Sequence, residues 1–308
     1  MKLVFVHGRA QQGKDPAQLQ QEWVHALTAG LEKSNLKLQQ GVEVIFPYYG
    51  DRLDELLQEL DAPLVSDVLL RGAAPDSAEA AFRGELLYEI AQGAGVSDAE
   101  IQSHFSGTYQ EKGPLNWEWV QSILSALDKT PLGEVAIDVF TRDVYVYLTN
   151  RSVRKAIDGI VSASMPDGPC VVVGHSLGSV VSYNVLRNSS ASVGVRQYVT
   201  LGSPLGLNAI KRKLDVPLTM PACVQHWFNA MDKRDVVALH PLDTNNFDVF
   251  PAIQNKTDVD NHTPNRHGIT GYLDNAIVAK HIYAALASVQ ATTQPISSTG
   301  SNLLNRTP

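Results

Sequence analysis

The hydrophobic positions of the chain form two alternating patterns. Short, nearly continuous apolar runs are separated by segments in which apolar residues return every three or four positions. Runs of the first kind predict strands buried on both faces, and segments of the second kind predict amphipathic helices. This alternation favours an α/β fold, in which a mostly parallel central sheet is flanked by helices. The predicted strands are residues 3–6, 42–46, 170–173, 197–201 and 224–229, with 249–253 as a weaker sixth.

Helix signals lie between these runs. Asp15 can cap a helix, and Pro16 suits its first position, where a missing N–H costs nothing. The apolar residues that follow share one helical face, as do those after the strand at 170–173. These two stripes are Leu19, Trp23, Ala26 and Leu27, and Leu177, Val180, Val181 and Val185.

Residues 47–169 contain no strong strand pattern, and the segment is too long for a single crossover. Several helical stripes fill it, and Ser97 with Glu100 predicts a capping box. A last helical stretch, residues 139–161 with a break near Asn150, would return the chain to the sheet. The stripes are Leu53, Leu56, Leu57, Leu60 and Leu64; Phe82, Leu86 and Ile90; and Val120, Ile123, Leu124 and Leu127.

The pattern therefore predicts three parts. We expect a core made of residues 1–50 and 136–289, into which residues 51–135 are inserted as a helical cap. Residues 290–308 are polar and lack periodicity, so they predict a loose tail.

Composition narrows the class of protein. The chain is 44% hydrophobic and 19% charged, which is typical of a globular protein with a sizeable core. Its net charge is −7 and it has no Lys/Arg run, so we expect no nucleic-acid partner. The N-terminal apolar run is too short for a secretory signal, and no stretch approaches the length of a membrane span. Cys170 and Cys223 each fall in a predicted strand, which favours buried thiols and a cytoplasmic protein.

The strongest candidate for chemistry is Ser176, in the pentapeptide GHSLG of residues 174–178. An apolar strand precedes this sequence and an amphipathic helix follows it, so Ser176 would stand on the turn between them. A serine hydroxyl is a weak nucleophile, but such a turn exposes it, and the glycines avoid collisions with neighbouring backbone. The alternative is a structural serine in a tight turn.

Four segments in this order, LVFVHGRA, VVVGHSLGSVV, YVTLGSPLG and WFNAMDKRDVVA, give the chain a resemblance to the lipase/esterase-like group of α/β-hydrolases. The resemblance covers the predicted core, and the cap at 51–135 matches nothing assigned. It implies the α/β-hydrolase fold and a nucleophile, acid and histidine in that chain order.

The resemblance places the acid in DKRDVV, which contains Asp232 and Asp235. The similar family motif has its catalytic residue at the second aspartate, so we choose Asp235; Asp232 would then be a turn residue that bonds its own loop. For the histidine we choose His267, which stands just before a closing helix. His262 is the reserve, and His281 fits the pattern of that helix.

A metal site is a competing interpretation of the same region. Asp258, Asp260, His262 and His267 gather carboxylate and imidazole groups in one polar segment. Their spacing matches no metal motif, so we expect no metal and no cofactor.

The oxyanion hole requires two backbone N–H groups. The resemblance places them at Leu177 and at Arg9, with His7 holding the loop by side-chain hydrogen bonds. We interpret the Arg9 side chain as solvated. The alternative interpretation is that it contacts a substrate carboxylate or phosphate. We expect no chemical role for His175 and a structural one for Ser203.

Together these features predict a serine hydrolase that cleaves a carboxylic ester, with an acyl chain, through Ser176, His267 and Asp235. The partner would be a small acyl ester or a lipid, with interfacial lipid contact as a variant. A thioesterase, an amidase or a peptidase could use the same three residues. An inactive α/β-hydrolase-fold binding protein is the alternative from another class.

Overall fold

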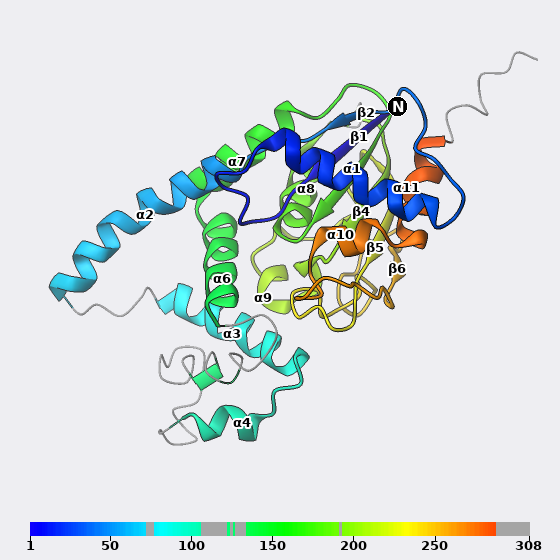
Figure 1. Cartoon of the computed structure of the whole chain (residues 1–308). Helices are drawn as coiled ribbons and strands as arrows, with labels where there is room; N and C mark the ends of the chain where they lie inside the picture. The colour runs from blue at the N-terminus through cyan, green and yellow to red at the C-terminus, as the bar shows by residue number, and fades with distance from the viewer. Residues whose placement is uncertain (72–76, 106–121, 124–125, 127–133, 191–192, 288–308) are drawn as a thin grey trace, which may run out of the picture.

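The structure is a computed structural model of the 308-residue chain, and it describes residues 1–71, 77–105, 122–123, 126, 134–190 and 193–287 (Figure 1). Its centre is a parallel sheet of six strands in the order β2-β1-β3-β4-β5-β6. The expected α/β fold is thus confirmed. The strands are β1 (Lys2–Val6), β2 (Glu43–Ile45), β3 (Cys170–His175), β4 (Val195–Leu201), β5 (Val224–Ala230) and β6 (Gln254–Lys256).

The register of the sheet brings the loops that follow four strands to one edge. Val6 pairs with Gly174, and His175 pairs with Leu201, which itself pairs with Ala230. Because all these strands are parallel, the segments after them emerge side by side. This carboxyl edge is where open α/β sheets bind ligands.

The prediction of a strand at 249–253 is wrong. Strand β6 begins at Gln254, directly after that run. Val249 and Ile253 are buried in the core, but they pack there from a loop. Pro251 has no N–H to donate to a ladder, and Phe250 is 91% exposed. Apolar spacing alone therefore misplaced the strand.

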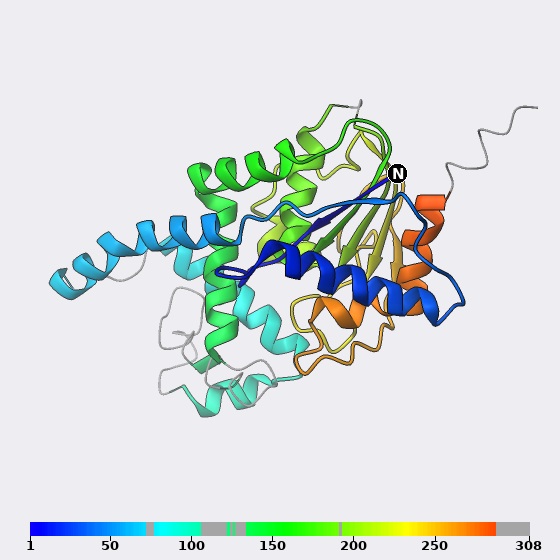
Figure 2. The same ribbon diagram turned by 45° about the horizontal axis from the view of Figure 1, so that its top comes forward.

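Helices cover both faces of the sheet (Figures 1 and 2). Alternate side chains of β1 enter two separate apolar clusters, Val4 and Val6 in one and Leu3 and Phe5 in the other. Helices α7 and α8 pack over the first cluster, and α1 and α11 over the second. These helices are α1 (Pro16–Glu32), α7 (Arg151–Ala163), α8 (Leu177–Asn188) and α11 (Ala276–Ala287), and the shorter ones are η2 (Pro204–Gly206), α9 (Asn208–Lys211) and α10 (Ile269–Leu273).

The local helix signals act as the sequence indicates. The Asp15 side chain accepts the N–H of Ala17 at 2.9 Å, and Pro16 is the first residue of α1. Asn150 caps α7 and separates it from α6, which confirms the break expected there.

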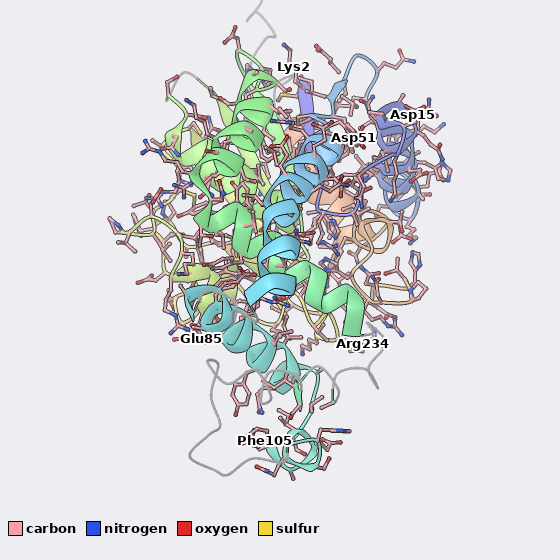
Figure 3. The ribbon with its side chains drawn as sticks, turned by 90° about the vertical axis from the view of Figure 1, so that its left-hand side faces the viewer. Lys2, Asp15, Asp51, Glu85, Phe105 and Arg234 are labelled. Atoms are coloured by element: carbon pink, nitrogen blue, oxygen red, sulfur yellow. The ribbon has the colours of Figure 1, made fainter. Side chains whose placement is uncertain are left out.

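Most of the described residues in the segment predicted as a cap are helical. The capping box of Ser97 and Glu100 is present. Figure 3 shows α3 running from the body of the molecule toward α4. The division into core and cap stays a prediction, and Val120, Leu124, Leu127 and the tail at 290–308 lie outside the described residues. The helices are α2 (Gly50–Arg71), α3 (Ser77–Gly93), α4 (Asp98–Ser103) and α6 (Glu134–Thr149).

Both cysteines are buried free thiols. Cys170 begins β3, whereas Cys223 directly precedes β5, so its predicted place inside the strand is wrong by one residue. Of the helices in the described part of the chain, none combines the length and apolar character needed to cross a lipid bilayer.

Candidate active site

Ser176 occupies the turn between β3 and α8. Its backbone has φ 52° and ψ −130°, a conformation that residues with a side chain rarely adopt. Two hydrogen bonds hold it there: the Ser176 N–H donates to the Leu201 carbonyl at 3.1 Å, and the Ser176 carbonyl accepts the Ser179 N–H at 2.9 Å. The strained turn is therefore fixed from β4 on one side and from α8 on the other.

The glycines around Ser176 are sterically required. A Cβ at Gly174 would lie 2.6 Å from the Ser182 hydroxyl, and one at Gly178 would overlap the carbonyl of His7. A Cβ at Gly8 would approach the Cβ of Ser176 to 3.0 Å. Close backbone approach at these three glycines is what lets the serine stand at the sheet edge.

The structure brings Ser176, His267 and Asp235 into one hydrogen-bonded chain. His267 Nε2 lies 2.8 Å from Ser176 Oγ, and His267 Nδ1 lies 2.8 Å from Asp235 Oδ2. Asp235 is fully buried, and the His267 side chain is 14% exposed. A carboxylate oxygen can only accept, so Nδ1 carries the proton and Nε2 accepts from the serine hydroxyl. This is the arrangement in which imidazole acts as a general base toward a serine.

Tyr272 completes the surroundings of Asp235, and the sequence analysis missed it. The Tyr272 hydroxyl donates to Asp235 Oδ2 at 2.6 Å, while the N–H groups of Val237 and Ala238 donate to Oδ1 at 2.9 and 3.3 Å. Burial, together with the neighbouring Asp235, holds the pKa of Tyr272 well above its usual value, so the hydroxyl keeps its proton. The only sequence signal was a tyrosine shortly after His267.

Asp232 lies outside the chain of three and ties two loops together. It accepts the N–H groups of Arg234 and Asn261, both at 2.8 Å, and pairs with the Arg234 side chain at 3.2 Å. Burial alone would raise the pKa of Asp232, but these hydrogen bonds hold it below its usual value. Asp232 is thus a residue that stabilises its loop, which is the alternative role considered for it from the sequence.

The other two candidate histidines are directed elsewhere. His262 is 61% exposed at its side chain and bonds Asp274 at 2.9 Å, so it does not replace His267. His281 lies in α11, as its spacing indicated, and its ring stacks on Phe228 with 3.8 Å between centroids.

The structure does not assemble the competing metal site. Asp258 pairs with Lys256, and Asp260 pairs with Arg234 and Arg266. Within the residues that the structure describes, no three His, Cys, Asp or Glu side chains are grouped as metal ligands would be.

His175 has a role that the sequence analysis did not expect. Its Nε2 lies 2.8 Å from the backbone carbonyl of His267, and the two rings are 4.8 Å apart. Burial first, and the nearby His267 second, lower the pKa of His175 to about 3, so its ring is neutral at pH 7. A neutral ring must donate from Nε2 to reach a carbonyl, which fixes the tautomer. His175 therefore anchors the loop that carries His267.

His7 holds the loop after β1, as predicted. Its Nδ1 bonds the Gly8 carbonyl at 2.7 Å, and its Nε2 accepts the Tyr49 N–H at 3.1 Å. Burial lowers the pKa of His7 to about 4, so the ring is neutral. The N–H groups of Arg9 and Leu177, the two expected oxyanion donors, have no acceptor among the described residues.

The prediction of a solvated Arg9 side chain is wrong. Arg9 Nε donates to Asp143 Oδ2 at 2.7 Å, and the two side chains are 19% and 7% exposed. The sequence could not show this pair because α6 brings Asp143 to the loop from far along the chain. Burial raises the pKa of Asp143, although Arg9 opposes that shift.

Ser203 is structural, as expected. Its Oγ lies 2.7 Å from the Ser179 hydroxyl and accepts the Leu205 N–H at 3.3 Å. It helps to join the loop after β4 to the first turn of α8.

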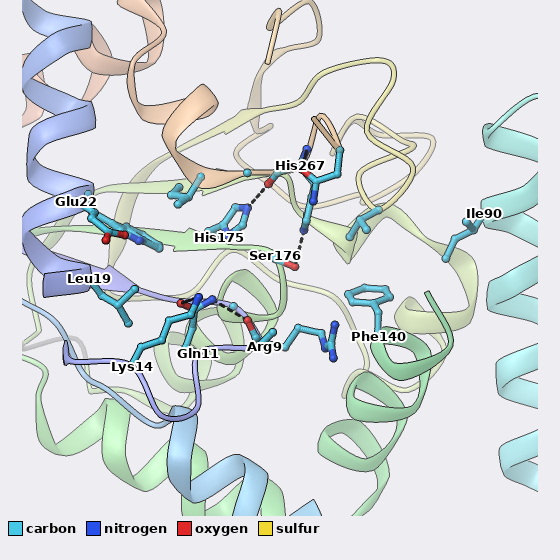
Figure 4. Close-up of a pocket in the computed structure, with 17 residues that line it drawn as sticks. Arg9, Gln11, Lys14, Leu19, Glu22, Ile90, Phe140, His175, Ser176 and His267 are labelled. Atoms are coloured by element: carbon cyan, nitrogen blue, oxygen red, sulfur yellow. Dashed lines mark hydrogen bonds between the residues drawn. The ribbon is translucent and has the colours of Figure 1, made fainter. Parts of the chain in front are cut away.

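A cavity of about 320 Å³ opens in front of Ser176 (Figure 4). Ile90 and Phe140 lie on one side of it, and Val237 is a further apolar residue of its lining. The other side carries the polar side chains of Gln11, Lys14 and Glu22, together with the apolar Leu19. The serine hydroxyl thus faces a partly open cavity whose two sides differ in polarity.

Searches of known protein families, of curated proteins and of solved structures found no match for this chain. The arguments for a function therefore come from the site itself.

Proposed function

We propose that the protein is a serine hydrolase that cleaves a carboxylic ester through an acyl-enzyme intermediate. One observation carries this proposal: the hydrogen bonds of 2.8 Å that link Ser176 to His267 and His267 to Asp235, at a strained turn that faces a cavity. A structural serine in a tight turn has no need of an imidazole aligned by a buried carboxylate.

Each residue has a distinct role in this mechanism. Ser176 Oγ attacks the ester carbonyl while His267 Nε2 takes its proton, and His267 later gives that proton to the leaving alcohol. Asp235 keeps the imidazole in the required tautomer and stabilises the imidazolium. Water, activated by the same histidine, then releases the acid.

The oxyanion of the tetrahedral intermediate would be held by the N–H groups of Leu177 and Arg9. Leu177 is the first residue of α8, so the positive end of that helix adds to its effect. His7 fixes the second donor loop through its two hydrogen bonds, which is the preorganisation that such a site needs.

We also infer that the chain has the α/β-hydrolase fold. Its support is the serine after β3, the acid after β5 and the histidine before the closing helices, all at one edge of a parallel sheet. The two free buried thiols favour a reducing compartment, which supports a cytoplasmic enzyme.

The shape of the cavity favours a small acyl ester as substrate. Its apolar residues suit an acyl chain, and a volume of about 320 Å³ suits a small molecule. The choice of an ester over a thioester or amide rests on the resemblance, because one set of three residues serves all of these bonds.

The test is hydrolysis of a panel of short chromogenic esters, thioesters and peptides by the wild type, Ser176→Ala and Ser203→Ala. We expect ester hydrolysis that Ser176→Ala lowers by about 10⁶-fold in kcat, because the three residues act as a unit. Ser203→Ala, at a buried serine of the same sheet edge, is the matched control and should keep most of the activity. Equal activity in Ser176→Ala and the wild type would refute the proposal.

A further inference from the structure

The Arg9 guanidinium has unused hydrogen-bond donors in a mostly buried position. It carries five N–H groups, of which the Nε–H is committed to Asp143 Oδ2 at 2.7 Å. The four N–H groups on its two Nη atoms have no acceptor among the described residues. With only 19% of the side chain exposed, these donors favour an acceptor that enters the cavity.

The hydrogen bond to Asp143 fixes the orientation of the Arg9 guanidinium. The Asp143 carboxylate is 7% exposed and bonds the Nε edge of Arg9, so the Nη edge faces away from it. Phe140 lies three positions earlier on α6, on the same face of the helix as Asp143, and lines the cavity. Figure 4 shows the Arg9 side chain reaching toward Phe140. The unused donors therefore lie on the side of the cavity that carries Ile90 and Phe140.

The position of Arg9 relative to His267 indicates which part of a substrate would meet it. The leaving alcohol takes its proton from His267, so it lies on the His267 side of Ser176. Figure 4 shows Arg9 on the opposite side of Ser176 from His267. Arg9 thus faces the acyl part of an ester rather than its alcohol.

We propose that Arg9 binds a carboxylate at the far end of the substrate's acyl group, so that the enzyme prefers monoesters of short dicarboxylic acids. This inference rests on the proposed function. A guanidinium fork matches the two oxygens of a carboxylate, and the apolar residues Ile90, Phe140 and Val237 would pack against the methylene groups between the two ends.

Lys14 is a second cation that could bind a substrate carboxylate in this cavity. It also lines the cavity, but on the side that carries Gln11 and Glu22, and its Nζ bonds the Gln11 side chain at 3.2 Å. The Lys14→Gln variant is therefore a matched control for loss of a positive charge from the same cavity.

The experiment compares monomethyl glutarate with methyl hexanoate, a neutral ester of similar length, by pH-stat at pH 7.5. The measured quantity is the ratio of kcat/KM for the charged ester to that for the neutral one. This ratio cancels any common effect that a variant has on the oxyanion loop. We expect the wild type to favour monomethyl glutarate, and Arg9→Gln to lower the ratio by about 10-fold to 100-fold, the range for a lost charge-assisted pair. Lys14→Gln should change it less than Arg9→Gln.

The Asp143→Asn variant supplies a second test with the opposite sign. Asparagine keeps an acceptor for the Arg9 Nε–H and removes the negative charge that competes with the substrate, so the ratio should rise. A purely structural tether between Arg9 and α6 predicts no such rise. If Arg9→Gln fails to fold, a ratio that stays the same or falls in Asp143→Asn would overturn the inference.

The two proposals fail in different ways. No hydrolysis of either ester by the wild type would refute the proposed function. Hydrolysis of both without a preference for monomethyl glutarate, an unchanged ratio in Arg9→Gln, or a larger loss in Lys14→Gln would refute the carboxylate site alone.

Discussion

The hydroxyl of Tyr272 donates to Oδ2 of Asp235 at 2.6 Å, the same oxygen that lies 2.8 Å from Nδ1 of His267. One carboxylate oxygen thus serves the histidine and the tyrosine together, while Oδ1 accepts two backbone N–H groups of its own loop. The carboxylate is held at both ends, which fixes the direction in which it presents Oδ2 to the imidazole. This arrangement makes Tyr272 a positioning residue for the proposed reaction.

Replacing Tyr272 by phenylalanine should lower kcat by about 10-fold with little change in KM, since second partners of a catalytic group typically contribute this much. Loss of the donor leaves more negative charge on Asp235, which stabilises the imidazolium. The acid limb of the pH profile of kcat/KM should therefore move to higher pH. A fall in kcat without that movement would mean that Tyr272 acts only in stability.

The two aspartates of the loop after β5 should respond differently to substitution. Asp235→Asn removes the negative charge that holds the His267 imidazole in the required tautomer and should lower kcat by about 10⁴-fold. Asp232→Asn weakens the tie to Arg234 and Asn261, so it should lower Tm and leave kcat of the folded fraction within about 10-fold. Steady-state kinetics and thermal unfolding of both variants check this ranking. The reverse order would move the acid of the triad to Asp232.

The neutral histidines make stability depend on acid pH. Burial lowers the pKa of His7 to about 4 and that of His175 to about 3, from 6.5 in the unfolded chain. The folded state therefore binds fewer protons than the unfolded state as pH falls below 6.5. The free energy of unfolding should be highest above pH 6.5 with respect to these two groups and decrease toward pH 4. Urea unfolding at pH 7, 6 and 5 measures it.

His25, which is exposed on α1, offers a control for that pH dependence. His25→Gln should leave the slope between pH 7 and 5 as in the wild type, whereas His175→Gln should reduce it. His175→Gln should also lower kcat, because it weakens the anchor on the His267 carbonyl. A slope that His175→Gln does not change would contradict the assignment of His175 as a neutral buried ring.

The sequence predicted correctly those elements whose signal comes from residues close together in the chain. The five main strands, the cap at Asp15 and the break at Asn150 depend on neighbouring residues, and the structure contains all of them. The grouping of Ser176, Asp235 and His267 followed from the resemblance, because their separation along the chain carries no periodic signal. The structure brings those three side chains together.

The features that the sequence missed depend on packing between distant segments. Asp143 reaches Arg9 only because α6 crosses beside the loop after β1, and His175 meets the His267 carbonyl across the sheet edge. The misplaced strand at 249–253 has a similar cause: Val249 and Ile253 are apolar because a loop packs into the core. Burial of this kind is set by the tertiary structure and leaves the same hydrophobic pattern as a strand.

The proposed reaction depends on Ser176 as a nucleophile that His267 activates. Reaction of the purified protein with a fluorophosphonate, followed by peptide mass spectrometry, measures this reactivity. We expect one adduct, on Ser176, whose formation is lost in Ser176→Ala and strongly slowed in His267→Ala. An unmodified Ser176 in folded wild-type protein, or an adduct that forms equally fast in His267→Ala, would contradict it.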